Sequence, residues 1–98
     1  MIHYIVHGEN DTVGVLTVDV KKRQTLRGWN MATDKTLRVK AAQDIPLGHK
    51  IALRDMGEGK DVIKYGRAIG RTRMDIAKGA HVHTQNVRSI RWETSIDE

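Results

Sequence analysis

A repeated corner motif dominates this chain, and its clearest copy reads Asp44-Ile45-Pro46-Leu47-Gly48-His49-Lys50-Ile51. Each copy has an Asp, an apolar residue, two variable residues, a Gly, two variable residues and a second apolar residue. Two more copies cover residues 55–62 and 75–82, and a fourth at 19–26 carries Arg23 in place of Gly. A Gly that tolerates positive φ turns the chain, and the Asp can hydrogen-bond the turning backbone. The pattern predicts four corners that each lead into a strand, with unrelated generic turns as the alternative.

The rest of the chain also favours strands over helices. Runs rich in β-branched residues lie at 2–6, 12–18, 36–40, 49–53 and 61–65, with turn-forming residues between them. The run 12–18 is apolar on both faces, which is typical of a strand that is buried on both sides. Gly28-Trp29-Asn30 is expected to interrupt the chain, and the only helix-like stretch, 71–78, is short and uncapped. We therefore expect an all-β domain with short strands and tight Gly turns.

Composition excludes several classes of protein. With 98 residues and 39% apolar residues, the chain is long enough for one domain with a modest core. The absence of Cys excludes a disulfide scaffold, an iron–sulfur centre and thiol catalysis. No apolar run has the length of a membrane span, and the first residues lack the pattern of a signal peptide. The expected location is the cytoplasm.

The charge balance favours anionic partners. The net charge is +5, and residues 93–98 hold three acids and no base, so the preceding residues are more basic still. A positive surface attracts nucleic acid, an acidic protein surface, or a small carboxylate, phosphate or sulfonate. Arg67, Arg71 and Arg73 form a basic stretch without the interleaved aromatic residues that stack on bases. Nucleic acid is therefore the weakest of these candidates.

The sharpest local signal for chemistry is His81-Val82-His83. On a strand, the apolar residue points into the core while both imidazoles point the other way, with their Cα atoms about 6.6 Å apart. Two imidazoles at that spacing can share a metal ion, although a complete site needs further ligands. The alternative is a pair of solvent-facing strand histidines. A two-ligand half-site would suggest that other ligands come from elsewhere in the fold or from another chain.

Four other residues are candidates for a site. His49 can act as an acid or base near neutral pH, and we predict that it is catalytic. Lys50 and Lys64 stand beside turns or strand ends, where an ammonium group can reach a bound anion. Asn86, just past the histidine pair, is a neutral hydrogen-bonding candidate for substrate binding. Ordinary solvated surface is the alternative for each residue.

An ordered series of segments resembles the SAF domain of the altronate/galactarate dehydratase family. The segments are residues 44–53, 62–66, 69–70, 81–83 and Asn86. Segments 6–7, 13–15, 28–31 and 88–92 make the chain similar to the free-standing small subunits of two-chain lyases in that family. The resemblance implies a β-clip fold over nearly the whole chain, with a single domain at 1–92 and an acidic tail at 93–98. It also implies that the large catalytic part is a separate chain.

The resemblance implies a β-elimination on a 2-hydroxy acid, performed only in complex with a large catalytic subunit. Sulfolactate is the preferred substrate, and altronate or galactarate are the alternatives. A divalent metal, expected to be Fe²⁺, would be shared with that subunit, with His81 and His83 as ligands on this chain. Lys50 and Lys64 would hold the anionic ends of the substrate. A third hypothesis is a non-catalytic module that binds anions, and no membrane partner is expected.

Two departures from the family pattern stand out. Arg23 occupies a corner position where the family usually has Gly, which is expected to alter only a turn. Thr84-Gln85 separates the histidine pair from Asn86, where a His is common directly before the Asn. The second departure removes a possible metal ligand from this segment.

Overall fold

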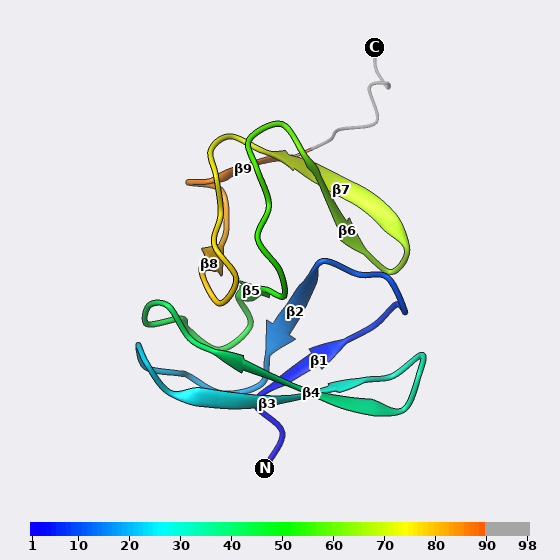
Figure 1. Cartoon of the computed structure of the whole chain (residues 1–98), viewed down its shortest axis with the longest axis vertical. Coiled ribbons are helices and arrows are strands. Elements are labelled where there is room, and N and C mark those ends of the chain that lie inside the picture. Colours follow the sequence, from blue (N-terminus) through cyan, green and yellow to red (C-terminus); the bar gives the residue numbers. More distant parts are fainter. Residues whose placement is uncertain (90–98) are drawn as a thin grey trace.

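Regular structure in this protein is entirely β-strand within residues 1–89, the part that the computed structural model describes. This confirms the predicted all-β fold, and these residues include no helix that could cross a membrane. The predicted acidic tail at 93–98 lies outside the described residues. The strands, labelled in Figure 1, are β1 (Tyr4–Val6), β2 (Val13–Leu16), β3 (Thr25–Asn30), β4 (Lys35–Lys40), β5 (Lys50–Ala52), β6 (Asp61–Lys64), β7 (Arg67–Thr72), β8 (His81–Val82) and β9 (Val87–Ser89).

The strands form two sheets. The larger sheet has the order β4-β3-β1-β2-β5-β8, and the smaller one has the order β6-β7-β9. Only β1 and β3 pair in parallel, and every other neighbouring pair is antiparallel. Figure 1 shows the β3–β4 hairpin at one end of the described part of the molecule and the small sheet at the other. Strands β2, β5 and β8 lie between these two ends.

Strand β2 is buried on both sides, as its sequence predicted. Val13 belongs to one apolar cluster, with Val62, Ile76 and Val82. Leu16, farther along the same strand, belongs to a second cluster around Tyr4, Leu26 and Ile51. One short strand therefore contributes to the apolar clusters at both ends of the fold.

The predicted interruption at Gly28-Trp29-Asn30 is wrong. These residues are the end of β3, which pairs with β1 and with β4. The ring of Tyr4 lies directly over Gly28, so that a Cβ there would collide with the ring atoms. Because Gly28 has no side chain, β3 can pack closely against the buried ring of Tyr4 from the neighbouring strand β1.

The four predicted corners are present, and they are joined in pairs. An isolated antiparallel bridge joins Val20 to Ile45, and another joins Met56 to Ile76. All four of these apolar residues are buried. The turning positions all have positive φ, including the one occupied by Arg23 instead of Gly. Their φ values are 74° at Arg23, 85° at Gly48, 80° at Gly59 and 88° at Gly79.

The aspartates of the motif bond the partner corner, and they do so reciprocally. Asp55 accepts a hydrogen bond from the Lys78 backbone N–H, and Asp75 accepts one from the Glu58 N–H. The other pair repeats the exchange, because Asp19 accepts from Leu47 and Asp44 accepts from Lys22. The prediction that each Asp bonds a turning backbone is confirmed, but the backbone belongs to the other corner of its pair. Unrelated generic turns do not account for this exchange.

Candidate functional site

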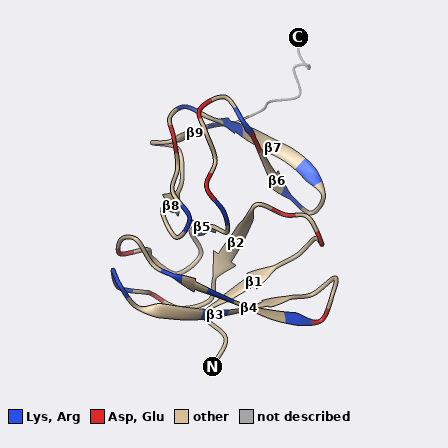
Figure 2. Ribbon diagram, viewed as in Figure 1, with Lys and Arg blue, Asp and Glu red and all other residues tan. Residues whose placement is uncertain are grey.

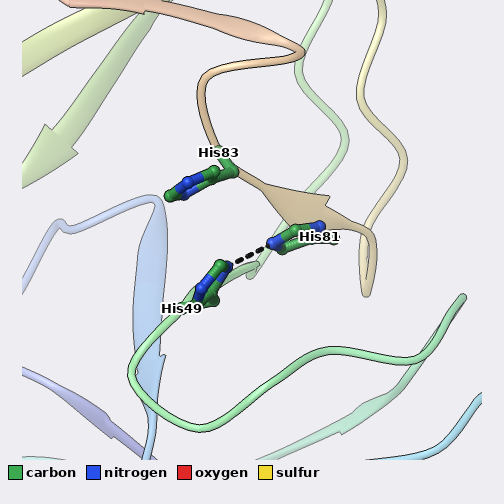
Figure 3. Close-up of side chains that lie close together, drawn as sticks. All are labelled: His49, His81 and His83. Atoms are coloured by element: carbon green, nitrogen blue, oxygen red, sulfur yellow. Dashed lines mark hydrogen bonds between the residues drawn. The ribbon is translucent and has the colours of Figure 1, made fainter.

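Three histidines from two corners meet in one cluster. The corner at Gly48 leads into β5 with His49 directly before the strand, and the corner at Gly79 leads into β8 with His81 at its start. Strands β5 and β8 are antiparallel neighbours, with Ile51 opposite His81. One ring nitrogen from each of His49, His81 and His83 lies within 4.8 Å of the others. Figure 3 shows the three rings converging from these two chain segments.

The rings lie close enough to share a proton. Nδ1 of His49 and Nε2 of His81 are 2.8 Å apart, so one of these nitrogens donates and the other accepts. The rings of His49 and His83 are stacked, with centroids 4.4 Å apart. As predicted from strand alternation, the intervening Val82 points into the core and is 2% exposed. His49 was not predicted to join the histidine pair, and this contact is decided by the pairing of β5 with β8.

Asn86 fixes the backbone of the histidine pair. Its side-chain amide donates to the carbonyl of His81 over 2.6 Å and accepts from the N–H of His83 over 2.9 Å. The residue is buried, with 7% of its surface exposed. The sequence had suggested Asn86 as a group that binds substrate. In the structure its amide is engaged with the chain itself, where it orients the two histidines.

Two glutamines that the sequence did not single out as site residues also contact His81. The Gln85 side-chain amide lies 3.3 Å from Nδ1 of His81, and Gln43 accepts the backbone N–H of His81 over 3.0 Å. A hydrogen bond to the second ring nitrogen fixes the tautomer and orientation of a metal-binding histidine. Gln85 follows the histidine pair at a position where the sequence suggested only the loss of a ligand. The sequence alone did not predict this contact, because it depends on the turn at residues 83–86, which brings Gln85 close to the ring of His81.

The electrostatics of the cluster favour the neutral form of His81. Partial burial lowers the pKa of His81 below its ordinary value, and the neighbouring His49 and His83 lower it further. The neutral imidazole is the form that binds metal ions, since a protonated ring has no free lone pair. At neutral pH His81 is therefore in the form that can bind a metal ion.

The three histidines fit a transition-metal ion. With metal–nitrogen bonds of about 2.1 Å, tetrahedral geometry sets ligand nitrogens about 3.4 Å apart. The separation of 2.8 Å between His49 and His81, and the 4.8 Å limit for all three residues, bracket that value. Imidazole suits iron, zinc, copper and nickel, and three protein ligands leave positions for other groups. The cluster can therefore hold a metal ion.

A shallow pocket of about 170 Å³ adjoins the cluster, and it brings a cation beside the histidines. Its floor is mostly apolar, and Lys50 and His83 both line it. Burial lowers the pKa of Lys50, and the nearby charge of Lys64 lowers it further. Two ammonium groups close enough to repel each other form a local site for negative charge. The lining residues are Lys50, Val62, Ile69, Val82, His83, Thr84, Val87 and Ser89.

Residues 2–90 match the family model described as the altronate/galactarate dehydratase SAF domain. The match covers nearly the whole chain. The chain belongs to this family. The paired corners and short strands described above are thus the form that the SAF domain takes in this protein.

Among the relatives of this SAF-domain chain are free-standing small proteins and one segment of a longer enzyme. It is 46% identical over 92 residues to the (2R)-sulfolactate sulfo-lyase subunit alpha of Chromohalobacter salexigens, covering 93% of this chain and 98% of that protein. It is 47% identical over 55 residues to the subunit of the same name from Paracoccus pantotrophus, covering 56% and 82%. It is 39% identical over 88 residues to altronate dehydratase of Escherichia coli K12, covering 90% of this chain but 17% of that enzyme.

Proposed function

We propose that this chain is the small subunit of a two-chain, metal-dependent lyase that converts (2R)-3-sulfolactate to pyruvate and sulfite. The relatives named sulfo-lyase subunit alpha support this proposal, because one of them aligns with this chain over almost the full length of both. The word subunit in their name supports a separate large partner, which we propose carries the rest of the active site. The cytoplasmic location expected from the sequence stays a prediction.

The observation that carries the proposal is the three-histidine cluster beside a pocket that Lys50 lines. The elimination requires removal of the proton on carbon 2 and formation of a double bond between carbons 2 and 3. The bond from carbon 3 to sulfur breaks, and its electron pair leaves with sulfite. The enol product then takes a proton at carbon 3 and loses the proton of its 2-hydroxyl group, which gives pyruvate. Negative charge develops near the carboxylate as the first proton leaves, so cationic groups near that position lower the barrier.

We propose that His49, His81 and His83 hold the metal ion, which we expect to be Fe²⁺. The sequence suggested His49 as a catalytic acid or base, but its position 2.8 Å from His81 supports the role of third ligand. The bound ion would supply Lewis acidity to the carboxylate and 2-hydroxyl group of the substrate. Asn86 and Gln85 would keep His81 in its binding orientation through their hydrogen bonds.

We propose that Lys50 and Lys64 bind the negative charges of the substrate. Sulfolactate is a dianion with a carboxylate and a sulfonate, and each ammonium group offers three donors to such oxygens. Mutual repulsion of the two lysines is relieved when an anion binds between them, which adds to the affinity.

A sugar-acid dehydratase is the second candidate, because altronate dehydratase of Escherichia coli K12 aligns with 90% of this chain. In that case water would leave from carbon 3 instead of sulfite, and the histidines and lysines would have the same roles. An anion-binding module without catalysis is the third candidate. The experiment below separates the three.

The test is to purify the tagged full chain from its source cells with whatever large chain accompanies it. The eluate is incubated without oxygen with Fe²⁺ and sulfolactate, altronate or galactarate. We expect a large partner and release of sulfite. Dehydration of a sugar acid without sulfite release would show that the chain belongs to a sugar-acid dehydratase. Absence of both a large partner and activity would favour the anion-binding module.

The metal site has its own test on the full chain. We expect His81→Ala and His83→Ala to weaken Fe²⁺ binding, measured by anaerobic calorimetry, by at least about tenfold. His3→Gln is the matched control, because His3 lies outside the cluster and bonds the Arg27 backbone. Equal Fe²⁺ affinity in all variants would refute the assignment of these ligands.

A further inference from the structure

The turn between β6 and β7 places a tyrosine where its backbone conformation is unfavourable. Tyr65 has φ of 57° and the following Gly66 has φ of 72°, so both central residues of this two-residue hairpin turn are left-handed. Such turns favour Asn-Gly or Asp-Gly, because a short polar side chain tolerates that conformation and a bulky one does not. A strained residue is retained where the side chain serves another purpose.

The rest of the fold holds this turn in place. The carboxylate of Asp11 is 2% exposed and accepts hydrogen bonds from the backbone N–H groups of Tyr65 and Gly66. The same carboxylate accepts from the N–H of Gly8, which ties the loop after β1 to the turn. Three backbone donors on one buried carboxylate fix the position of the turn. The tyrosine ring is therefore presented in a defined place.

The ring of Tyr65 is not part of the core. Its residue is 60% exposed, and neither apolar cluster includes it. It stacks on His7 with ring centroids 4.2 Å apart, and Nζ of Lys64 lies 4.8 Å from its centre. These contacts orient the ring while leaving much of it accessible. Core packing among residues 1–89 does not explain why a large aromatic side chain occupies this position.

The residues that flank the turn are basic. Lys64 precedes the turn and the exposed Arg67 follows it, and Figure 2 shows both strands blue where they meet the turn. Among residues 1–89 the ion pairs are Lys21 with Asp44 and Arg71 with Asp61, so neither Lys64 nor Arg67 has an acidic partner there. A rigid, exposed aromatic ring between unpaired cations is typical of an interface anchor, where Tyr and Arg contribute strongly.

We propose that His7, Tyr65 and Arg67, here named the Tyr65 tip, dock an acidic segment of the large partner subunit. This inference rests on the proposed function, because it requires that partner. Charge complementarity selects an acidic segment, and the fixed turn lowers the entropy lost on binding. Lys64 is close enough to lower the pKa of Lys50, which lines the pocket beside His83. Docking at the tip therefore places the partner next to the candidate site.

The decisive variant is Tyr65→Asn, which removes the ring and installs the residue that the turn prefers. We expect the variant chain to resist urea at least as well as the wild type, because backbone strain is relieved. We expect its affinity for the co-purified large subunit to fall at least tenfold. Leu47→Asn is the matched control, since Leu47 lies at another turn and is 58% exposed, and its affinity should be unchanged.

Each outcome decides a specific point. Unchanged affinity in Tyr65→Asn would overturn the inference, and so would an affinity of the wild type that does not fall with rising salt. A second variant, Tyr65→Phe, keeps the ring and should retain most of the affinity. A wild-type complex that releases no sulfite would overturn the proposed substrate while leaving the docking result valid. Failure of the wild type to capture any large chain would overturn both proposals.

Discussion

The corners that enter β5 and β8 carry histidines, while the corners that enter β3 and β6 carry none, although all four have the same backbone design. His49 and His81 follow the positive-φ positions Gly48 and Gly79. After Arg23 and Gly59 the chain continues with Gln24-Thr25 and Lys60-Asp61. The repeated motif thus supplies a scaffold, and the residues just past the turn determine what each corner contributes.

Strand pairing explains why only one set of corners can build a site. Strands β5 and β8 are direct antiparallel neighbours, with Lys50 opposite Val82 and Ile51 opposite His81, so His49 just before β5 lies beside residues 81–83. Strand β3 belongs to the large sheet and β6 to the small one, so the residues after their corners are held apart. Histidines placed after Arg23 and Gly59 would have the same local geometry without meeting. Two corners with the same motif therefore form a site only when the strands that they enter lie side by side.

Substitutions at the corner glycines are the strongest test of the backbone design that the corners share. We expect Gly79→Ala to destabilise the protein by more than about 3 kcal/mol, because the new Cβ would collide with the carbonyl of Lys40 at a left-handed φ. Gly59→Ala has the same backbone demand but open space around it, so about 1 to 2 kcal/mol is expected. Urea unfolding measures both. Equal losses would show that backbone conformation alone decides the cost.

Substitutions of the motif aspartates test whether two paired corners act as one structural unit. Asp55→Ala and Asp75→Ala should each cost about 1 kcal/mol, because each removes one hydrogen bond to the other corner. Together they should deviate from additivity by about 0.5 kcal/mol or more, since both bonds belong to one structural unit. Asp19→Ala combined with Asp55→Ala affects different pairs and should be additive. Additivity in both double variants would contradict the corner pairs as units.

The histidine corners should also make stability depend on pH. The folded-state pKa of His81 is lowered, so the unfolded chain takes up this proton first as the pH falls below about 6.5. The contribution of His81 to stability is therefore present above that pH and is lost as the pH falls toward the folded-state pKa. Metal-free protein should lose stability as the pH falls below about 6.5. His81→Ala should lose less over that range in thermal unfolding, and a slope identical to the wild type would refute this.

The smallest effect is expected at the corner without glycine. Arg23→Gly should raise the free energy of unfolding by about 0.5 kcal/mol, because relief of the left-handed backbone exceeds the entropy cost of Gly. The side chain is exposed and no ion pair of Arg23 occurs among residues 1–89, so little is lost with it. A decrease in stability would show that the arginine side chain supports this corner.

Local patterns predicted what depends on near neighbours. The positive-φ positions, the alternation around Val82 and the burial of β2 on both sides all follow from rules that operate within a few residues. The error at Gly28 has the opposite cause. Glycine normally weakens a strand, but the Tyr4 ring from a neighbouring strand fills the space that its missing side chain leaves.

In the candidate site, too, some features were predictable from the sequence and others depend on the tertiary structure. The sequence identified His81 and His83 as a pair on one strand face, and Lys50 from its charge and its place beside a turn. It did not indicate that His49 completes the cluster or that Gln85 approaches the ring of His81, because both contacts depend on how β5, β8 and the turn at 83–86 are arranged.

By itself the sequence determined four corners, short strands, a basic surface and a histidine pair on one strand face. Each of these follows from steric and periodic preferences of neighbouring residues. Only the tertiary structure decided which corners pair, which strand lies beside β8 and which backbone each aspartate bonds. Those choices bring together residues that are distant in the sequence, such as Asp19 and Leu47, and they depend on which arrangement buries the apolar residues of all four corners at once.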